Sequence, residues 1–121
     1  MKVKIDTKEK MHVITLEEDK LTANMTEELQ IFFLKYLDES ISNLVVSLEN
    51  VNEIDLTGAN ALVSVQEAFY KLNYSMVFCN LQPAVSDFLN KNELLDRMNV
   101  TPTESEAWDI VQMEEIEREL L

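Results

Sequence analysis

The stretch Leu44-Val-Val-Ser-Leu-Glu-Asn-Val-Asn-Glu-Ile-Asp-Leu-Thr-Gly-Ala-Asn-Ala-Leu62 decides the fold of this 121-residue chain. Its first five residues form a short apolar run rich in β-branched side chains, which is typical of a central strand covered on both faces. A polar turn at 49–53 follows, and the segment 54–58 leads into an amphipathic helix. The helix is indicated by apolar residues that recur every three or four positions, namely Ala61, Leu62, Val65, Ala68, Phe69 and Leu72. Strand, turn and helix in this order predict one crossover unit of a parallel sheet.

The residues before this unit predict a hairpin and a first helix. Segments 2–8 and 11–17 alternate apolar and polar residues with a period of two, and a short polar connection joins them. An amphipathic helix is expected over 22–39, with Thr22 or Asn24 as its N-terminal cap.

The residues after the unit continue the alternation of strands and helices. A strand is expected over 74–80, a third helix opens at Pro83, and a short extended piece precedes a last helix. That helix begins at about 103, where Thr103 and Glu106 form a capping-box pattern. The order predicts an α/β fold, a small mixed sheet of about five strands with an antiparallel N-terminal edge and about four helices. The chain is read as a single domain over 1–121.

Composition and charge exclude several classes of function. The net charge of −13 argues against nucleic acid or an anionic membrane as the main ligand and favours protein partners. No stretch approaches the roughly 18 apolar residues of a membrane span, and the first residues lack a signal-peptide core, so a cytoplasmic protein without membrane insertion is expected. With Cys79 and His12 each alone of their kind, no disulfide, metal site or cofactor is predicted. The sequence predicts no particular oligomeric state.

The segment Ile54-Asp55-Leu56-Thr57-Gly58 resembles the signature of the STAS domain of anti-sigma factor antagonists, in which Asp-Ser-Ser/Thr-Gly opens a helix. The segment Leu81-Gln82-Pro83-Ala84-Val85 is similar to the start of the family's third helix, and the resemblance spans about 3–112. It implies a STAS-like fold and a bacterial signalling module that regulates transcription by binding a protein, without being an enzyme. The alternative is a STAS subunit or scaffold of another complex, such as a transporter or a signalling assembly.

The resemblance also implies where a partner binds. A kinase-like anti-sigma factor or another regulator would dock on the turn and on the start of the second helix. In this chain the docking residues would be Val51, Asn52, Glu53, Asp55, Leu56, Thr57 and Gly58.

The chain departs from the family pattern at the residue after the aspartate. The family phosphorylates a hydroxyl there, whereas this chain has Leu56, followed by Thr57. Asp55 or Thr57 can accept hydrogen bonds from the first free amides of the helix. Three interpretations of the turn stay open: Thr57 caps the helix, Thr57 is a shifted phosphorylation site, or Leu56 is an apolar anchor in an interface without a phosphate switch. Catalysis by Asp55 as base and Thr57 as nucleophile is disfavoured, because no histidine, basic residue or Gly-rich phosphate loop lies nearby.

The one glycine, Gly58, is expected where backbone or partner must approach closely. Asn73, Asn92 and the pair at 18–19 occupy neighbourhoods where family members carry glycine, and asparagine tolerates the left-handed conformation.

The last helix is strongly acidic, since residues 101–121 carry seven carboxylates and one arginine. A solvated face is the favoured interpretation of this charge. Met113, Ile116 and Leu120, with Leu121 beside them, either pack on the domain or offer an apolar patch to a partner. The remaining candidates favour packing roles: Cys79 as a buried hydrophobe, His12 on a strand and Trp108 over the sheet edge or core rim.

Overall fold

The computed structural model describes residues 1–120, and over this range the main sheet has five strands in the order β1-β2-β4-β6-β7. β1 runs antiparallel to β2, and the other neighbours are parallel. The mixed sheet with an antiparallel N-terminal edge is therefore confirmed. The strands are β1 (Val3–Thr7), β2 (His12–Leu16), β4 (Leu44–Ser47), β6 (Met76–Cys79) and β7 (Val100–Thr101).

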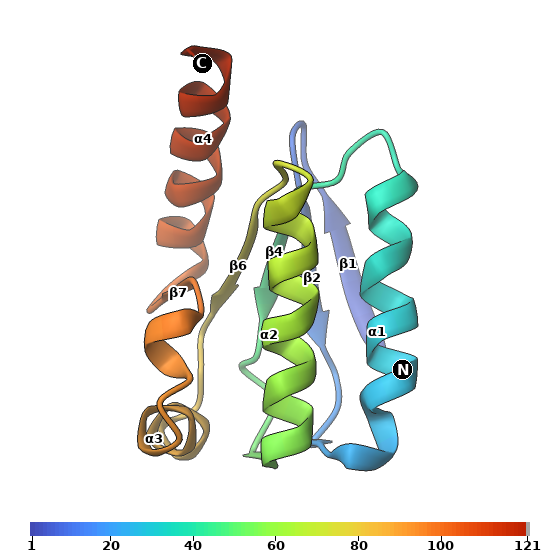
Figure 1. The fold of residues 1–121 in the computed structure, drawn as a ribbon, viewed down its shortest axis with the longest axis vertical. Helices are drawn as coiled ribbons and strands as arrows, with labels where there is room; N and C mark the ends of the chain where they lie inside the picture. Colours follow the sequence, from blue (N-terminus) through green and yellow to red (C-terminus); the bar gives the residue numbers. More distant parts are fainter. Residues whose placement is uncertain (121) are drawn as a thin grey trace.

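Residues 1–120 form the four predicted α-helices, of which three lie between strands and the fourth follows the last strand (Figure 1). They are α1 (Thr26–Leu34), α2 (Leu56–Lys71), α3 (Pro83–Lys91) and α4 (Glu104–Leu120), with short 3-10 turns at Ala23–Met25, Lys35–Asp38 and Leu95–Arg97. Pro83 is the first residue of α3, as expected. The caps predicted for the first helix are wrong, because the chain enters α1 through a 3-10 turn and Met25 takes the cap position.

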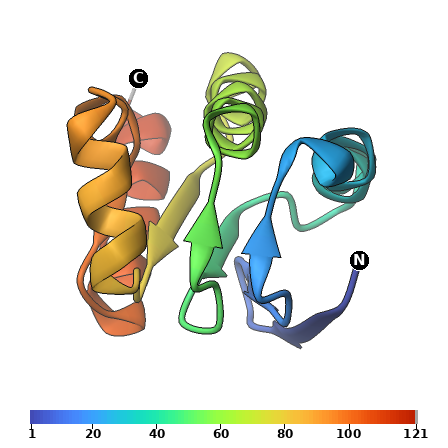
Figure 2. The same ribbon diagram turned by 90° about the horizontal axis from the view of Figure 1, so that it is seen from below.

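The helices cover the two faces of the sheet unequally. Figure 2 shows α1 and α2 side by side over one face, where they bury the larger core. On the other face α4 packs Ala107 and Val111 against Val45 and Val77 of β4 and β6. All four residues of β4 are buried, so the central strand is confirmed. No helix within residues 1–120 has the length and apolar character needed to cross a membrane.

A second, two-residue ladder joins β3 (Lys20–Leu21) to β5 (Glu53–Ile54) in parallel. Such short strands show no periodicity, so sequence patterns did not predict them. The ladder matters because it fixes the residues immediately before α2, where the candidate site lies.

Two helices end in left-handed residues other than glycine. After α2, Asn73 has a φ of 63°, which confirms the expectation, while Leu72 is 55% exposed and does not belong to the buried stripe. After α3, the expectation of a left-handed Asn92 is wrong, because its φ is −95° and the neighbouring Glu93 has a φ of 59° instead. In both places the next amide bonds back into the helix, Tyr74 to the Phe69 carbonyl and Leu94 to the Leu89 carbonyl.

Candidate partner-binding turn

The turn before α2 is organised by the carboxylate of Asp55. Its Oδ1 accepts a hydrogen bond from the amide of Gly58 at 2.7 Å, and its Oδ2 accepts one from the amide of Ala23 at 2.9 Å. Asp55 is therefore the N-terminal cap of α2, and it also ties α2 to the segment that leads into α1. The interpretation of Thr57 as the cap is wrong, because Thr57 lies inside the first turn of the helix.

Gly58 is buried, and its φ is not positive, so conformational freedom does not explain it. A Cβ at this position would overlap the carbonyl oxygen of Leu21 and lie 2.9 Å from its carbonyl carbon. The same oxygen accepts a hydrogen bond from the Asp55 amide at 3.1 Å. The close approach that requires glycine is thus between α2 and β3 within this chain, rather than between the chain and a partner.

The rest of the turn is strapped to the residues before β3. The amides of Asn52 and Glu53 donate to the carbonyl oxygen of Asp19 at 2.8 and 3.2 Å, and the Asn52 side-chain amide bonds the Asp19 carboxylate. Lys20 also lies 3.7 Å from the Glu53 carboxylate, although this exposed ion pair adds little stability. The turn therefore presents its outer side chains from a well-anchored backbone.

The predicted docking residues divide into an inner and an outer group. Val51 has no exposed surface and Gly58 is buried, so they shape the turn and cannot touch a partner while it stays folded. Asn52, Glu53 and Thr57 are exposed, and Leu56 has 48% of its surface exposed as the first residue of α2. The outer group therefore combines one exposed apolar side chain, Leu56, with three exposed polar ones.

The other candidate residues lie away from this surface. Cys79 is fully buried, and burial together with the charges of Glu104 and Glu49 raises the pKa of its thiol from 9.0 to about 12, so it is inert at neutral pH. His12 is half-buried, with its Nδ1 2.8 Å from the Thr7 hydroxyl. Residues 1–120 contain no group of three His, Cys, Asp or Glu residues placed to hold a metal ion.

The apolar stripe of the last helix does not pack on the domain. Met113, Ile116 and Leu120 are exposed by 53, 57 and 81% on α4, so the packing interpretation is wrong for these three residues. Leu121 lies outside the described residues. Trp108 is partly buried and packs against the smaller core, as expected for a residue at the core rim.

The fold is a small α/β domain in which Asp55 and the ladder of β3 and β5 fix the turn before α2. A family model described as STAS domain matches residues 2–107. The chain therefore belongs to the STAS domain family.

Solved structures show the same fold at low sequence identity. An anti-sigma factor antagonist from Mycobacterium paratuberculosis is 16% identical with a TM-score of 0.78, over 92% of this chain and 93% of that one. The antagonist SpoIIAA of Bacillus, in its unphosphorylated form, is 17% identical with a TM-score of 0.70, over 92% and 96%. The murine anion transporter Solute Carrier 26 family member A9 is 18% identical with a TM-score of 0.70, over 86% of this chain and 18% of the transporter. A search of curated proteins gives no match.

Proposed function

We propose that this chain is a protein-binding regulatory module that docks on a partner through the outer group Asn52, Glu53, Leu56 and Thr57. The observation that carries the proposal is the position of Leu56, an apolar side chain that is about half exposed at the start of a helix. Asp55 and the ladder of β3 and β5 fix the backbone beneath it. Anchoring by an exposed apolar side chain with a polar rim is the usual anatomy of a protein interface.

The partner is proposed to be a kinase-like anti-sigma factor or a related transcriptional regulator. Two of the similar structures are anti-sigma factor antagonists, which supports this class of partner. We propose binding without catalysis, because both oxygens of Asp55 are engaged as acceptors for backbone amides. The buried, unpaired Cys79 fits the cytoplasm as the expected compartment.

We propose that Leu56 is an apolar anchor of the interface and that position 56 is not a phosphorylation site. SpoIIAA exists in an unphosphorylated and a phosphorylated form, but Leu56 carries no hydroxyl. Thr57 is exposed and stays the position for a shifted switch. Phosphate there would add nearly two negative charges beside Glu53 and Asp55, which would repel an acidic or apolar docking face. Mapping phosphorylation of Thr57 in protein from the native host tests the shifted switch. Absence of the modification under all growth conditions would contradict a switch at Thr57.

A second candidate function is a subunit of a transporter assembly. The structural similarity to part of an anion transporter favours it, and the same outer group would serve as the contact. The identity of the captured partner separates the two functions, since one predicts a membrane protein and the other a regulator.

The docking surface is tested by photo-crosslinking from position 56, with position 72 as the matched control. Leu72 is a leucine of similar exposure at the opposite end of α2. We expect position 56 to capture a partner that position 72 does not. We also expect Leu56→Glu to weaken binding of the purified partner at least tenfold, while Leu72→Glu leaves it unchanged. Equal binding of the wild-type chain and Leu56→Glu would contradict the proposal.

A further inference from the structure

The outer face of α4 carries an exposed apolar stripe. Met113, Ile116 and Leu120 lie at helical spacing and are each more than half exposed. The opposite face of the same helix buries Ala107 and Val111 against the sheet. The stripe spans about 10 Å along the helix, which is close to two turns.

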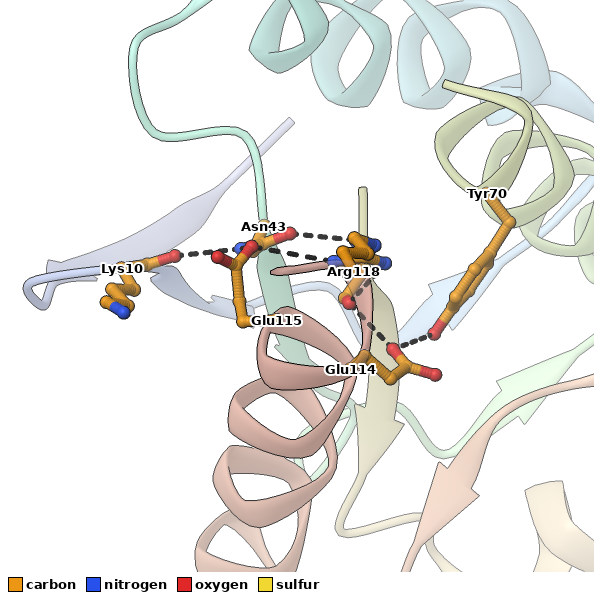
Figure 3. A network of polar contacts seen from close by, with 7 residues as sticks. Lys10, Asn43, Tyr70, Glu114, Glu115 and Arg118 are labelled. Carbon is orange, nitrogen blue, oxygen red and sulfur yellow. Dashed lines mark hydrogen bonds and ion pairs between the residues drawn. The ribbon is translucent and has the colours of Figure 1, made fainter. Parts of the chain in front are cut away.

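Polar contacts fix the orientation of α4 at the same two turns (Figure 3). The side-chain amide of Asn43 donates to Glu115 at 2.6 Å and to the Lys10 carbonyl oxygen at 3.1 Å. Glu114 accepts from the hydroxyls of Tyr70 and Ser75 at 2.8 and 2.6 Å.

Arg118 completes this network by donating to the Ser75 hydroxyl at 2.9 Å. Polar side chains of α4 thus hold the inner side of these two turns against the domain. The outward direction of Met113, Ile116 and Leu120 is therefore built into the fold rather than left by loose packing.

The exposed charges of α4 around the stripe are mainly acidic, while Lys8 and Lys10 of the hairpin line a groove that Ile116 borders. Asp109, Glu117 and Glu119 are exposed on α4, and Arg118 is the one cation among residues 104–120. A second copy of this chain would bring two such acidic surfaces together, which is unfavourable. An apolar partner face flanked by lysine or arginine would satisfy both features of the surface.

A groove beside the stripe adds a place for a partner side chain. Ile116 forms part of its wall, together with Trp108 and Gln112 of α4 and Lys8 of the hairpin. The indole N–H of Trp108 is buried and has no acceptor within residues 1–120.

We propose that the outer face of α4, centred on Met113, Ile116 and Leu120, is a docking surface for a basic amphipathic helix of a partner protein. The family match ends at residue 107, before the stripe begins. The C-terminal end of α4 and the N-terminal end of α2 lie at opposite ends of the molecule (Figure 1). The α4 surface is therefore separate from the turn at Leu56 and does not depend on the function proposed for it.

The test measures binding of the full chain to a labelled synthetic helix of leucine and lysine, about 18 residues or roughly five turns long, by fluorescence anisotropy. A peptide of equal composition with scrambled spacing is the ligand control. The triple variant Met113→Gln/Ile116→Gln/Leu120→Gln removes the stripe while keeping good helix formers. Ile31→Gln is the matched control, because Ile31 is 65% exposed on α1.

We expect the triple variant to weaken binding at least tenfold and Ile31→Gln to change it less than twofold, with both variants folded by circular dichroism. Glu117→Gln/Glu119→Gln should also weaken binding, and added salt should weaken it further. Unchanged binding by the triple variant, or equal binding of the scrambled peptide, would overturn the proposal. So would a wild-type dimer in sedimentation that the triple variant abolishes, because a second copy would then be the occupant.

Discussion

Replacing Gly58 by alanine tests the central steric contact of the turn. In an open helix the change from glycine to alanine stabilises by up to about 1 kcal/mol. Here the new Cβ would overlap the Leu21 carbonyl, whose carbon would lie 2.9 Å away. The obstacle is backbone and cannot rotate away, so α2 or β3 must move. Moving Leu21 would also strain its 3.1 Å hydrogen bond from the Asp55 amide.

Overpacking of this kind costs about 1–3 kcal/mol, and the backbone overlap here favours the upper part of that range. After the helix-propensity gain is subtracted, we expect a net loss of about 2 kcal/mol in the free energy of unfolding. Urea denaturation followed by circular dichroism measures this loss as a lower midpoint at an unchanged slope. The control is Ser64→Ala on the exposed face of the same helix, which should stabilise by a few tenths of a kcal/mol, about the difference in helix propensity. If Gly58→Ala proved as stable as the wild-type chain, the steric account of this glycine would be refuted.

Three further predictions concern the ends of the sheet and the helices. Asn43→Ala should lower the free energy of unfolding by about 2–3 kcal/mol, because it leaves the buried Ser75 amide without its acceptor. It also removes the hydrogen bond to Glu115, so hydrogen exchange in the last turns of α4 should become faster, and unchanged exchange would contradict this. Stability should fall as pH rises from about 9 to about 12, because the pKa values of Cys79 and Tyr70 are raised from 9.0 and 10.0 to about 12 in the fold, so both ionise first in the unfolded chain. The fall of the urea midpoint across that range should be shallower in Cys79→Ala, where only the Tyr70 contribution of this pair remains, and an unchanged slope would argue against burial of the thiol as a cause. Glu93→Gly should stabilise by about 1 kcal/mol, because it relieves a left-handed conformation at an exposed residue, and a lower urea midpoint would count against this.

The order of strands and helices was predictable because each element carries its own periodicity or boundary signal. The apolar run at 44–48 marks the central strand, and Pro83 marks the start of α3. The ladder of β3 and β5 was not predictable, since two-residue strands are defined by their partner rather than by their own pattern. The network around Asn43 joins residues more than thirty positions apart and has no local signal either.

The candidate turn shows where local sequence reasoning ends. Asp55 and Thr57 are both plausible caps from composition, and the first helical residue decides between them. Because α2 begins at Leu56, the aspartate takes the cap position and the threonine is left exposed. Burial of Val51 depends on the tertiary packing of the turn against the core, which a polar neighbourhood in sequence does not reveal.

The residues that adopt a left-handed conformation show why Gly58 is required, because none of those in the described range is a glycine. Within residues 1–120, Asn73, Asn80 and Glu93 all adopt a positive φ, so this fold accepts larger residues where glycine is favoured for its conformation. A left-handed residue adds local strain that surrounding hydrogen bonds can hold in place. A Cβ pressed against a fixed carbonyl has no such remedy, because two backbone segments would have to separate. Space, rather than flexibility, is therefore the property for which Gly58 is required.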